Sequence, residues 1–244
     1  GNVTGKQYTS GVVGFITAGA QDSVYLIGCY NEGTVVGTGY TGGIAGRLNS
    51  FTSVTGCYND GTVTGTGTYT GGVLSYGSGR EIYDCFNSGT VNGANYTGGV
   101  IGTVSSSNNI SDVYNNTDGL VTGTGQYVGG VFGSFKCNGF ATSMYNKGRV
   151  EATASNSYVG GVFGTISAGC NDYISFSYNE GTVESNGNAV GGVVGFLNGS
   201  WTYSGGYNIS HLTNSWNMGT VTGKSSQTAV GGVAGLQNNS ANNN

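Results

Sequence analysis

The most informative stretch of this chain reads CYNDGTVTG over residues 57–65 and YTGGV over residues 69–73. The first half recurs seven times, always with an aromatic residue before an Asn. The second half recurs eight times, seven times around Gly-Gly and once around Ser10-Gly11. The repeated Asn residues lie 28, 28, 28, 31, 33 and 38 residues apart: Asn31, Asn59, Asn87, Asn115, Asn146, Asn179 and Asn217. A period near 30 residues is typical of a solenoid, in which stacked units share one core.

The residue pattern inside each unit predicts short strands. Val stands at the centre of the segment after each Asn-x-Gly, as in Val63, and its neighbours Thr62 and Thr64 are polar. The residue after Gly-Gly is β-branched in every copy. Such alternation is typical of strands with one buried face, and the frequent Gly pairs disfavour helices. We therefore predict an all-β fold: a right-handed parallel β-helix of about 7–8 coils, with about three short strands per coil.

The repeat also predicts the domain organisation. Residues 1–235 are expected to form a single solenoid domain in which residues 194–216 carry an inserted loop, and residues 236–244 are expected to form a polar tail. Both ends of the sequence fall inside the repeat pattern. We therefore expect a fragment of a larger protein, with targeting and anchoring signals elsewhere.

Composition narrows the possible partners. Charged residues make up 7% of the chain, Pro is absent, and the net charge is −4 with 7 scattered basic residues. Without a basic patch, nucleic acid is not an expected partner. The sequence contains no run of 18 apolar residues, so no membrane insertion is expected in this fragment. The exposed strands of the first and last coils favour end-to-end self-association as a further possibility.

The repeated Asn is expected to have a structural role. A turn buried in a solenoid leaves backbone groups without water, and each unpaired group is costly. An Asn side chain both donates and accepts hydrogen bonds. Stacked copies can therefore bond to one another and to the turn backbone. We predict a structural ladder through all seven repeated Asn residues.

The sequence contains few of the residue types that catalytic and metal-binding sites require. His211 is the only histidine, and no cluster of His and Cys at short spacing is present. Calcium-binding repeats of the Gly-Gly-x-Gly-x-Asp type would carry an Asp in every copy, which this repeat does not, so repeated calcium sites are not expected. Glu151 and Glu184 should stack one coil apart as a weak cation site, but an exposed polar face is the favoured interpretation. We predict no enzyme, no catalytic residues, no metal and no cofactor.

One segment breaks the period and is the candidate ligand-binding loop. Residues 198–211 extend the spacing between Val193 and Asn217, and insertions in solenoids often form the binding face. The candidate binding residues, an aromatic platform for a sugar or a peptide, are Trp201, Tyr203, Tyr207 and His211. The alternative is a loop that folds back over its own aromatic residues or over the end of the rod.

Two further features leave alternatives open. A Tyr lies shortly before most Gly-Gly pairs. The favoured arrangement has its ring pointing inward or half-buried, and the alternative is an outward aromatic strip along the rod. These residues are Tyr8, Tyr40, Tyr69, Tyr96, Tyr127 and Tyr158. Cys137 and Cys170 should be neighbours in adjacent coils, and free thiols are favoured over a disulfide. Cys29, Cys57 and Cys85 occupy one small, mostly apolar slot.

The repeat resembles the GLUG motif, a glycine-rich repeat of large bacterial surface proteins. The resemblance is carried by residues 57–65 and by the pieces around Ile44 and Tyr178, and it recurs along nearly the whole chain. It implies a secreted, extracellular or cell-wall-attached protein and a structural motif without catalytic residues. The function expected is a stalk or repeat domain that mediates or supports adhesion.

Two alternatives follow from this reading. The first is a binding module for host glycans or glycoproteins, or those of a neighbouring cell, that uses the 198–211 loop. The second is an accessory domain of a secreted peptidase, since the motif also occurs beside immunoglobulin A peptidases.

Overall fold

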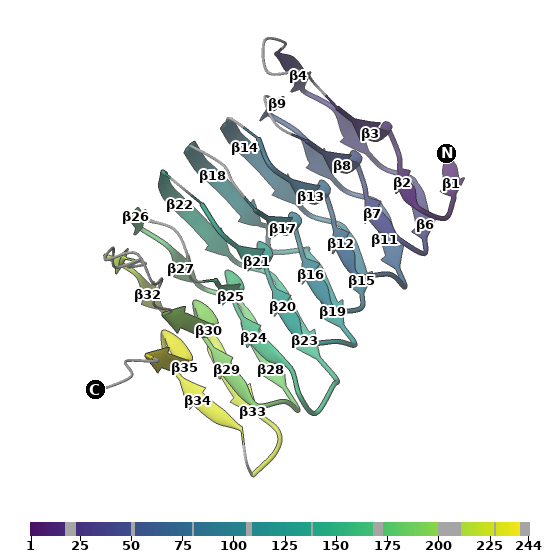
Figure 1. Cartoon of the computed structure of the whole chain (residues 1–244). Coiled ribbons are helices and arrows are strands. Elements are labelled where there is room, and N and C mark those ends of the chain that lie inside the picture. The colour runs from purple at the N-terminus through teal and green to yellow at the C-terminus, as the bar shows by residue number, and fades with distance from the viewer. Residues whose placement is uncertain are drawn as a thin grey trace, which may run out of the picture.

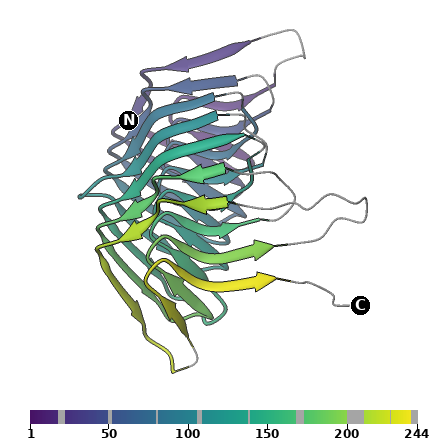
Figure 2. The ribbon, with the colours of Figure 1, turned by 90° about the vertical axis from the view of Figure 1, so that its left-hand side faces the viewer.

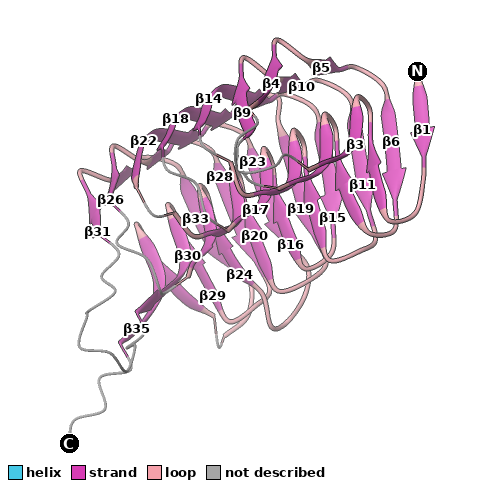
Figure 3. Cartoon of the chain, turned by 45° about the horizontal axis from the view of Figure 1, so that its top comes forward, coloured by secondary structure: helices cyan, strands magenta, loops and turns pink. Residues whose placement is uncertain are grey.

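The computed structural model describes residues 1–17, 23–49, 52–79, 81–105, 109–137, 139–167, 173–199, 211–226 and 228–239. Every regular element in these ranges is a β-strand (Figure 3). Equivalent strands of neighbouring coils pair in parallel, and the coils stack into a rod with the first and last described strands, Asn2–Thr4 and Ala234–Asn239, at opposite ends (Figure 1). The predicted all-β solenoid is confirmed.

The strands of the described residues form four sheets. Sheet 1 contains the Thr-Val segments: β1 (Asn2–Thr4), β6 (Thr34–Gly37), β11 (Thr62–Gly65), β15 (Thr90–Gly93), β19 (Leu120–Gly123), β23 (Arg149–Ala152), β28 (Thr182–Ser185) and β33 (Thr220–Gly223). Sheet 2 contains the segments that enter Gly-Gly: β2 (Tyr8–Ser10), β7 (Tyr40–Gly42), β12 (Tyr69–Gly71), β16 (Tyr96–Gly98), β20 (Tyr127–Gly129), β24 (Tyr158–Gly160), β29 (Ala189–Gly191) and β34 (Ala229–Gly231).

Sheets 3 and 4 complete each coil. Sheet 3 follows Gly-Gly: β3 (Val13–Ile16), β8 (Ala45–Leu48), β13 (Leu74–Gly77), β17 (Ile101–Val104), β21 (Phe132–Phe135), β25 (Phe163–Ile166), β30 (Val194–Gly199) and β35 (Ala234–Asn239). Sheet 4 leads into the repeated Asn: β4 (Val24–Ile27), β5 (Tyr30–Asn31), β9 (Thr52–Thr55), β10 (Tyr58–Asn59), β14 (Glu81–Asn87), β18 (Asn109–Asn115), β22 (Phe140–Asn146), β26 (Tyr173–Ser175), β27 (Tyr178–Asn179), β31 (His211–Thr213) and β32 (Trp216–Asn217).

Sheets 1, 2 and 4 correspond to the three strands per coil that the sequence predicts. The strand of sheet 3 is separated from that of sheet 2 by a bend of two residues, Gly72 and Val73 in one coil. Backbone bonds between coils continue through this bend, with Val73 N donating to Val100 O at 2.8 Å. Figure 2 shows the coils stacked along the rod.

The core lies inside the coils as columns of equivalent side chains. The Val column of sheet 1 is fully buried from the second coil to the seventh: Val35, Val63, Val91, Val121, Val150 and Val183. The column after Gly-Gly is equally buried in the inner coils: Ile44, Val73, Val100, Val131, Val162 and Val193. Val12, in the first coil, is 48% exposed. Each coil therefore depends on its neighbours for burial, as in other solenoids.

Sheet 4 has a backbone irregularity that the sequence pattern does not reveal. One residue in each coil, two positions before the repeated aromatic, has a positive φ between 47° and 62°: Gly28, Gly56, Asp84, Asp112, Ser143, Phe176 and Asn214. This left-handed conformation suits Gly and is tolerated by Asn and Asp, but it is strained for a bulky side chain. The position lies inside one continuous strand in three coils, in β14, β18 and β22, and separates two short strands of sheet 4 in the other four.

Phe176 should be the most strained member of this column. We expect Phe176→Asn to raise the free energy of unfolding by about 1 kcal/mol, because Asn adopts the left-handed region at lower cost. Phe140→Asn is the matched control, since Phe140 is also exposed but does not have a positive φ. Urea denaturation of both variants measures the difference. Equal effects of the two substitutions would contradict the strain.

A second column, in sheet 2, contains unpaired hydroxyls. The Oγ1 atoms of Thr9, Thr41 and Thr70 are buried without a hydrogen-bond partner, whereas Thr97, one coil further, donates to Ala94 O at 3.2 Å. Val128 occupies the equivalent place in the next coil. The site therefore accepts an apolar side chain of this shape.

Thr70→Val should stabilise the protein by about 1 kcal/mol, because it removes a buried hydroxyl that has no partner. Thr97→Val should give no such gain, since it removes a hydroxyl that donates a hydrogen bond. Thermal unfolding of Thr70→Val and Thr97→Val measures this difference as a difference in melting temperature. A lower melting temperature for Thr70→Val would show that its hydroxyl is satisfied.

The prediction of a polar tail at 236–244 is wrong in part. β35 extends to Asn239 and pairs with β30, and Leu236 lies opposite Phe196. The ladder uses backbone groups, so polar side chains do not prevent pairing, and β30 would otherwise end as an open edge. Residues 240–244 lie outside the described residues.

Candidate functional site

The seven repeated Asn side chains form one column inside the coil, along sheet 4. Each Nδ2 donates to the Oδ1 of the Asn in the next coil, at 2.7–2.8 Å through all six steps. The same Nδ2 atoms donate to a nearby Gly carbonyl, as from Asn59 to Gly61 O at 3.1 Å. The inner five Asn residues have no exposed surface. The column therefore satisfies buried turn carbonyls that no water reaches.

This Asn ladder has a direction. Every amide donates toward the C-terminal end of the rod and accepts from the N-terminal side. At the N-terminal end, Asn31 Oδ1 accepts only from the backbone N–H of Gly33, at 3.2 Å, within the described residues. At the other end, Asn217 Nδ2 donates to Gly219 O at 3.0 Å. The two ends of the ladder are therefore chemically different.

A column of stacked rings lies on the outer face of sheet 4, one residue before the ladder. Its members are Tyr30, Tyr58, Phe86, Tyr114, Tyr145, Tyr178 and Trp216, with centroids 4.6–5.4 Å apart and interplanar angles of 3–9°. Burial raises the pKa of Tyr145 to about 12, and the neighbouring tyrosines add to this effect. Because the ring faces contact each other, this column presents mainly ring edges to a ligand. The signal for this column in the sequence is the aromatic residue that directly precedes every repeated Asn.

The candidate binding loop is described only at its edges. Trp201, Tyr203 and Tyr207 lie outside the described residues, so the predicted platform is represented by His211 alone. His211 is exposed on β31 and stacks on Tyr173 with centroids 5.0 Å apart. Tyr173 in turn stacks on Phe140 at 5.7 Å. The described residues therefore place His211 at the end of a short exposed aromatic row on sheet 4.

The Tyr column of sheet 2 is half-buried on the outer face, with its rings stacked 5.0–5.6 Å apart. Sheet 3 packs side chains against it, including Tyr76 edge-on to Tyr69 at 5.4 Å and Phe196 against Tyr158 at 4.8 Å. Of the two arrangements left open by the sequence, the half-buried one is therefore present. This column offers no open aromatic strip.

Glu151 and Glu184 stack one coil apart on sheet 1, as expected. Basic side chains already occupy the space beside them, since Arg149 and Lys224 approach Glu184 at 2.8 and 3.0 Å. Lys224 also hydrogen-bonds Glu151 and is the main cause of its lowered pKa. The two carboxylates thus belong to an exposed ion-pair network. A cation that bound here would have to displace the side chains of Arg149 and Lys224.

The cysteines divide into two groups. Cys29, Cys57 and Cys85 are free thiols in one inward-facing column. Contact with the Cys85 thiol lowers the pKa of Cys57, and the same contact together with burial raises the pKa of Cys85. Cys137 is fully buried, and Cys170 lies outside the described residues.

Clusters of metal-binding side chains and membrane-spanning helices are both absent from the described residues. No group of three or more His, Cys, Asp or Glu side chains there is arranged to hold a metal ion. The same residues include no helix with the length and apolarity needed to cross a bilayer.

Comparison with known proteins gives no relative. The chain matches no protein-family model, no curated protein and no solved structure.

Proposed function

We propose that this chain is a non-enzymatic spacer: a rigid repeat domain that holds other parts of a bacterial surface protein at a distance and so supports adhesion. The observation that carries this proposal is the unbroken Asn ladder. Six consecutive hydrogen bonds between Asn side-chain amides, five of them buried, link all seven coils that bear the repeated Asn. A coil that is bonded to both neighbours at a buried point cannot rotate or tilt freely.

Two further observations support a spacer. Strands β1 and β35 lie at opposite ends of the rod, so domains attached beyond them would be held apart (Figure 1). The inner coils repeat the same columns of buried and stacked side chains. The placement at a cell surface rests on the resemblance of the repeat to the GLUG motif.

Deletion of single coils tests the spacer. Residues 32–59 and 88–115 are two separate segments of 28 residues, and each runs from one repeated Asn to the next. Either deletion should leave the ladder continuous and shorten the rod by about 4.8 Å. In a surface-displayed protein with a binding domain fused at the outer end, both deletions should change attachment equally. Loss of attachment after only one of them would point to a local binding site and contradict the spacer.

A second candidate is a glycan-binding module on sheet 4. The observation that favours it is the exposed row that ends at His211, where Phe140 and Tyr173 are 68% and 52% exposed. A glycan array probed with the native chain and with Tyr173→Ala tests this candidate. Specific binding that is lost in the variant would favour recognition over spacing. Val13→Ala, on sheet 3, is a control for nonspecific effects of substitution.

A further inference from the structure

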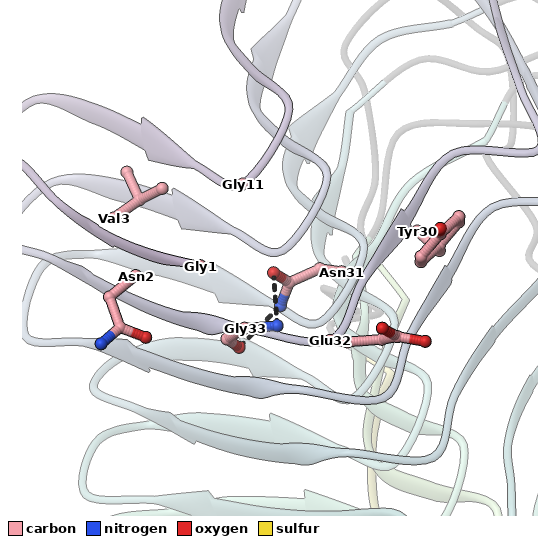
Figure 4. A pocket seen from close by; sticks show the side chains of 8 residues that line it. All are labelled: Gly1, Asn2, Val3, Gly11, Tyr30, Asn31, Glu32 and Gly33. Atoms are coloured by element: carbon pink, nitrogen blue, oxygen red, sulfur yellow. Dashed lines mark hydrogen bonds between the residues drawn. The ribbon is translucent and has the colours of Figure 1, made fainter.

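Three cysteines follow one another along the inner side of sheet 4. Each stands two residues before a repeated Asn: Cys29, Cys57 and Cys85. Figure 4 shows Tyr30 and Asn31 pointing in opposite directions, as neighbouring side chains in a strand do. The residue before Tyr30 therefore shares the inner side with Asn31, and Cys29 packs against the core there. Cys57 and Cys85 are fully buried in the same core.

The sulfurs of Cys57 and Cys85 have the same orientation. Each thiol donates to a carbonyl two residues earlier and to a carbonyl of the preceding coil. For Cys57 these acceptors are Thr55 O and Leu26 O, both at 3.5 Å, and for Cys85 they are Tyr83 O at 3.2 Å and Val54 O at 3.8 Å. The two sets of acceptors are register equivalents in adjacent coils. The two sulfurs are therefore one coil spacing apart, which is about 4.8 Å.

This spacing fits a cation shared by two thiolates. Bonds from a metal to a thiolate sulfur are about 2.3 Å long, so a linear sulfur–metal–sulfur unit spans about 4.6 Å. A disulfide requires Cβ atoms within about 4.5 Å of each other, which is closer than equivalent Cβ atoms of adjacent coils lie. The geometry thus favours a bridging ion over a direct bond between the two sulfurs.

The surroundings of the two thiols restrict which ion fits. Cys57 and Cys85 belong to the large apolar core cluster, together with Val54, Ile82 and Val113. Structural zinc takes four ligands, and no group of three or more His, Cys, Asp or Glu among the described residues is arranged to hold a metal ion. Calcium and magnesium require oxygen ligands. Thiolates select soft Cu(I), which two ligands alone can hold.

We propose that Cys57 and Cys85 bind one Cu(I) ion, which bridges two neighbouring coils from inside the core. On binding, both S–H bonds break, the two protons pass to the solvent, and two Cu–S bonds form without a change in oxidation state. The carbonyl of Thr55 loses a thiol donor but keeps the backbone bond from Gly28 N at 2.9 Å. This site is separate from the spacer role, so a failure here leaves the comparison of the two coil deletions unaffected.

Refolding the whole chain with Cu(I) and a competing chelator tests the proposal. Both sulfurs are enclosed in the folded rod, so the ion is supplied during refolding from urea, in oxygen-free buffer. Every chain carries Cys137→Ala, so that this buried thiol contributes no ligand. We expect one Cu(I) per chain, and X-ray absorption should show two sulfur ligands at about 2.3 Å.

Variants of the three cysteines locate the ion. Cys57→Val should weaken binding about 100-fold, because it leaves Cys29 and Cys85 two coils apart and only single thiolates available. Val113 occupies the same slot one coil beyond Cys85, so the fold should tolerate this substitution. Cys29→Val is the matched control, since it keeps the pair and should still bind one ion with unchanged affinity. Cys29→Val combined with Cys85→Val isolates Cys57 and should lose binding in the same way, which keeps the test valid if Cys57→Val misfolds.

Three outcomes would overturn the proposal. Equal binding by the parent chain and by Cys57→Val would show uptake by single thiols only. Loss of binding in Cys29→Val would place the ion between Cys29 and Cys57. A third ligand in the absorption spectrum would mean that the ion does not lie in a two-coordinate site between Cys57 and Cys85.

Discussion

Replacing Asn87 with Leu is expected to lower the free energy of unfolding by about 4 kcal/mol. Asn87 accepts from Asn59 and donates to Asn115 and to Gly89 O, all in a place without solvent exposure. Leu has a similar size but no polar atom, so three buried groups lose a partner. Each such loss costs about 1–3 kcal/mol, and the added apolar burial offsets only part of it.

Asn217→Leu is the matched control for this prediction. Asn217 ends the ladder, is partly exposed, and accepts one ladder bond from Asn179. Its replacement should cost about 1 kcal/mol, since water can reach the groups it leaves. Chemical denaturation of both variants gives the comparison. If the central and terminal substitutions cost the same, the ladder bonds are not the source of the stability.

The variant Asn87→Asp is expected to have a stability that depends on pH. In Asn87→Asp, a buried carboxylate would face the oxygens of Asn115 and Gly89, so its pKa in the folded protein should rise above the ordinary value near 3.9. Below that value both states hold the proton, and the Asp O–H can donate to Asn115 Oδ1. As the pH rises above 3.9, the unfolded state ionises while the folded state does not, and stability falls. The variant should therefore unfold at a lower temperature at pH 7 than at pH 3.5, relative to the native protein at each pH.

Gly99→Ala is the second substitution with a large expected effect. A Cβ built on Gly99 would overlap the carbonyl oxygen of Gly130 in the next coil and approach Val121 Cγ2 at 2.8 Å. A backbone carbonyl held in the inter-coil ladder cannot move away as a flexible side chain could. We expect a loss of about 3 kcal/mol or more, at the upper end of the range for overpacked cores.

Gly77→Ala separates this steric effect from the general effect of removing a glycine. Gly77 is also buried in a strand, but a Cβ there would meet only Leu74 Cδ1, at 3.6 Å. That substitution should be neutral or slightly stabilising, because Ala restricts the unfolded chain more than Gly does. Calorimetric melting of the two variants gives the answer. A tolerated Gly99→Ala would mean that neighbouring coils can move apart.

The repeat alone was sufficient to predict the fold, because solenoid side chains occupy the same place in every coil. The position of Val63 holds a Val in every copy, and this alone predicts a buried column. The spacing of Asn59 and its equivalents likewise indicated stacked side chains. These inferences succeed because one buried site, repeated seven times, leaves seven copies of the same pattern in the sequence.

Other features could not be predicted from the pattern, for physical reasons. The left-handed position is occupied by residues as different as Gly56 and Phe176, since the backbone conformation is imposed by the surrounding ladder. The ion pairs of Glu184 depend on Lys224, and the equivalent positions of the two preceding coils hold Asn186 and Thr153 instead of Lys. The pairing of β35 depends on backbone groups, which the polar composition after Leu236 conceals.

The direction of the inter-coil bonds has a mechanical consequence. The strands of each sheet are bonded to those of the neighbouring coils, so these bonds run along the rod. A force that pulls the two ends apart therefore loads the coils in series, and the outermost coil yields first. A released coil of 28 residues extends to about 95 Å, against the 4.8 Å it occupied when folded. Under tension the rod would therefore lengthen in steps, one coil at a time, before any covalent bond of the chain breaks.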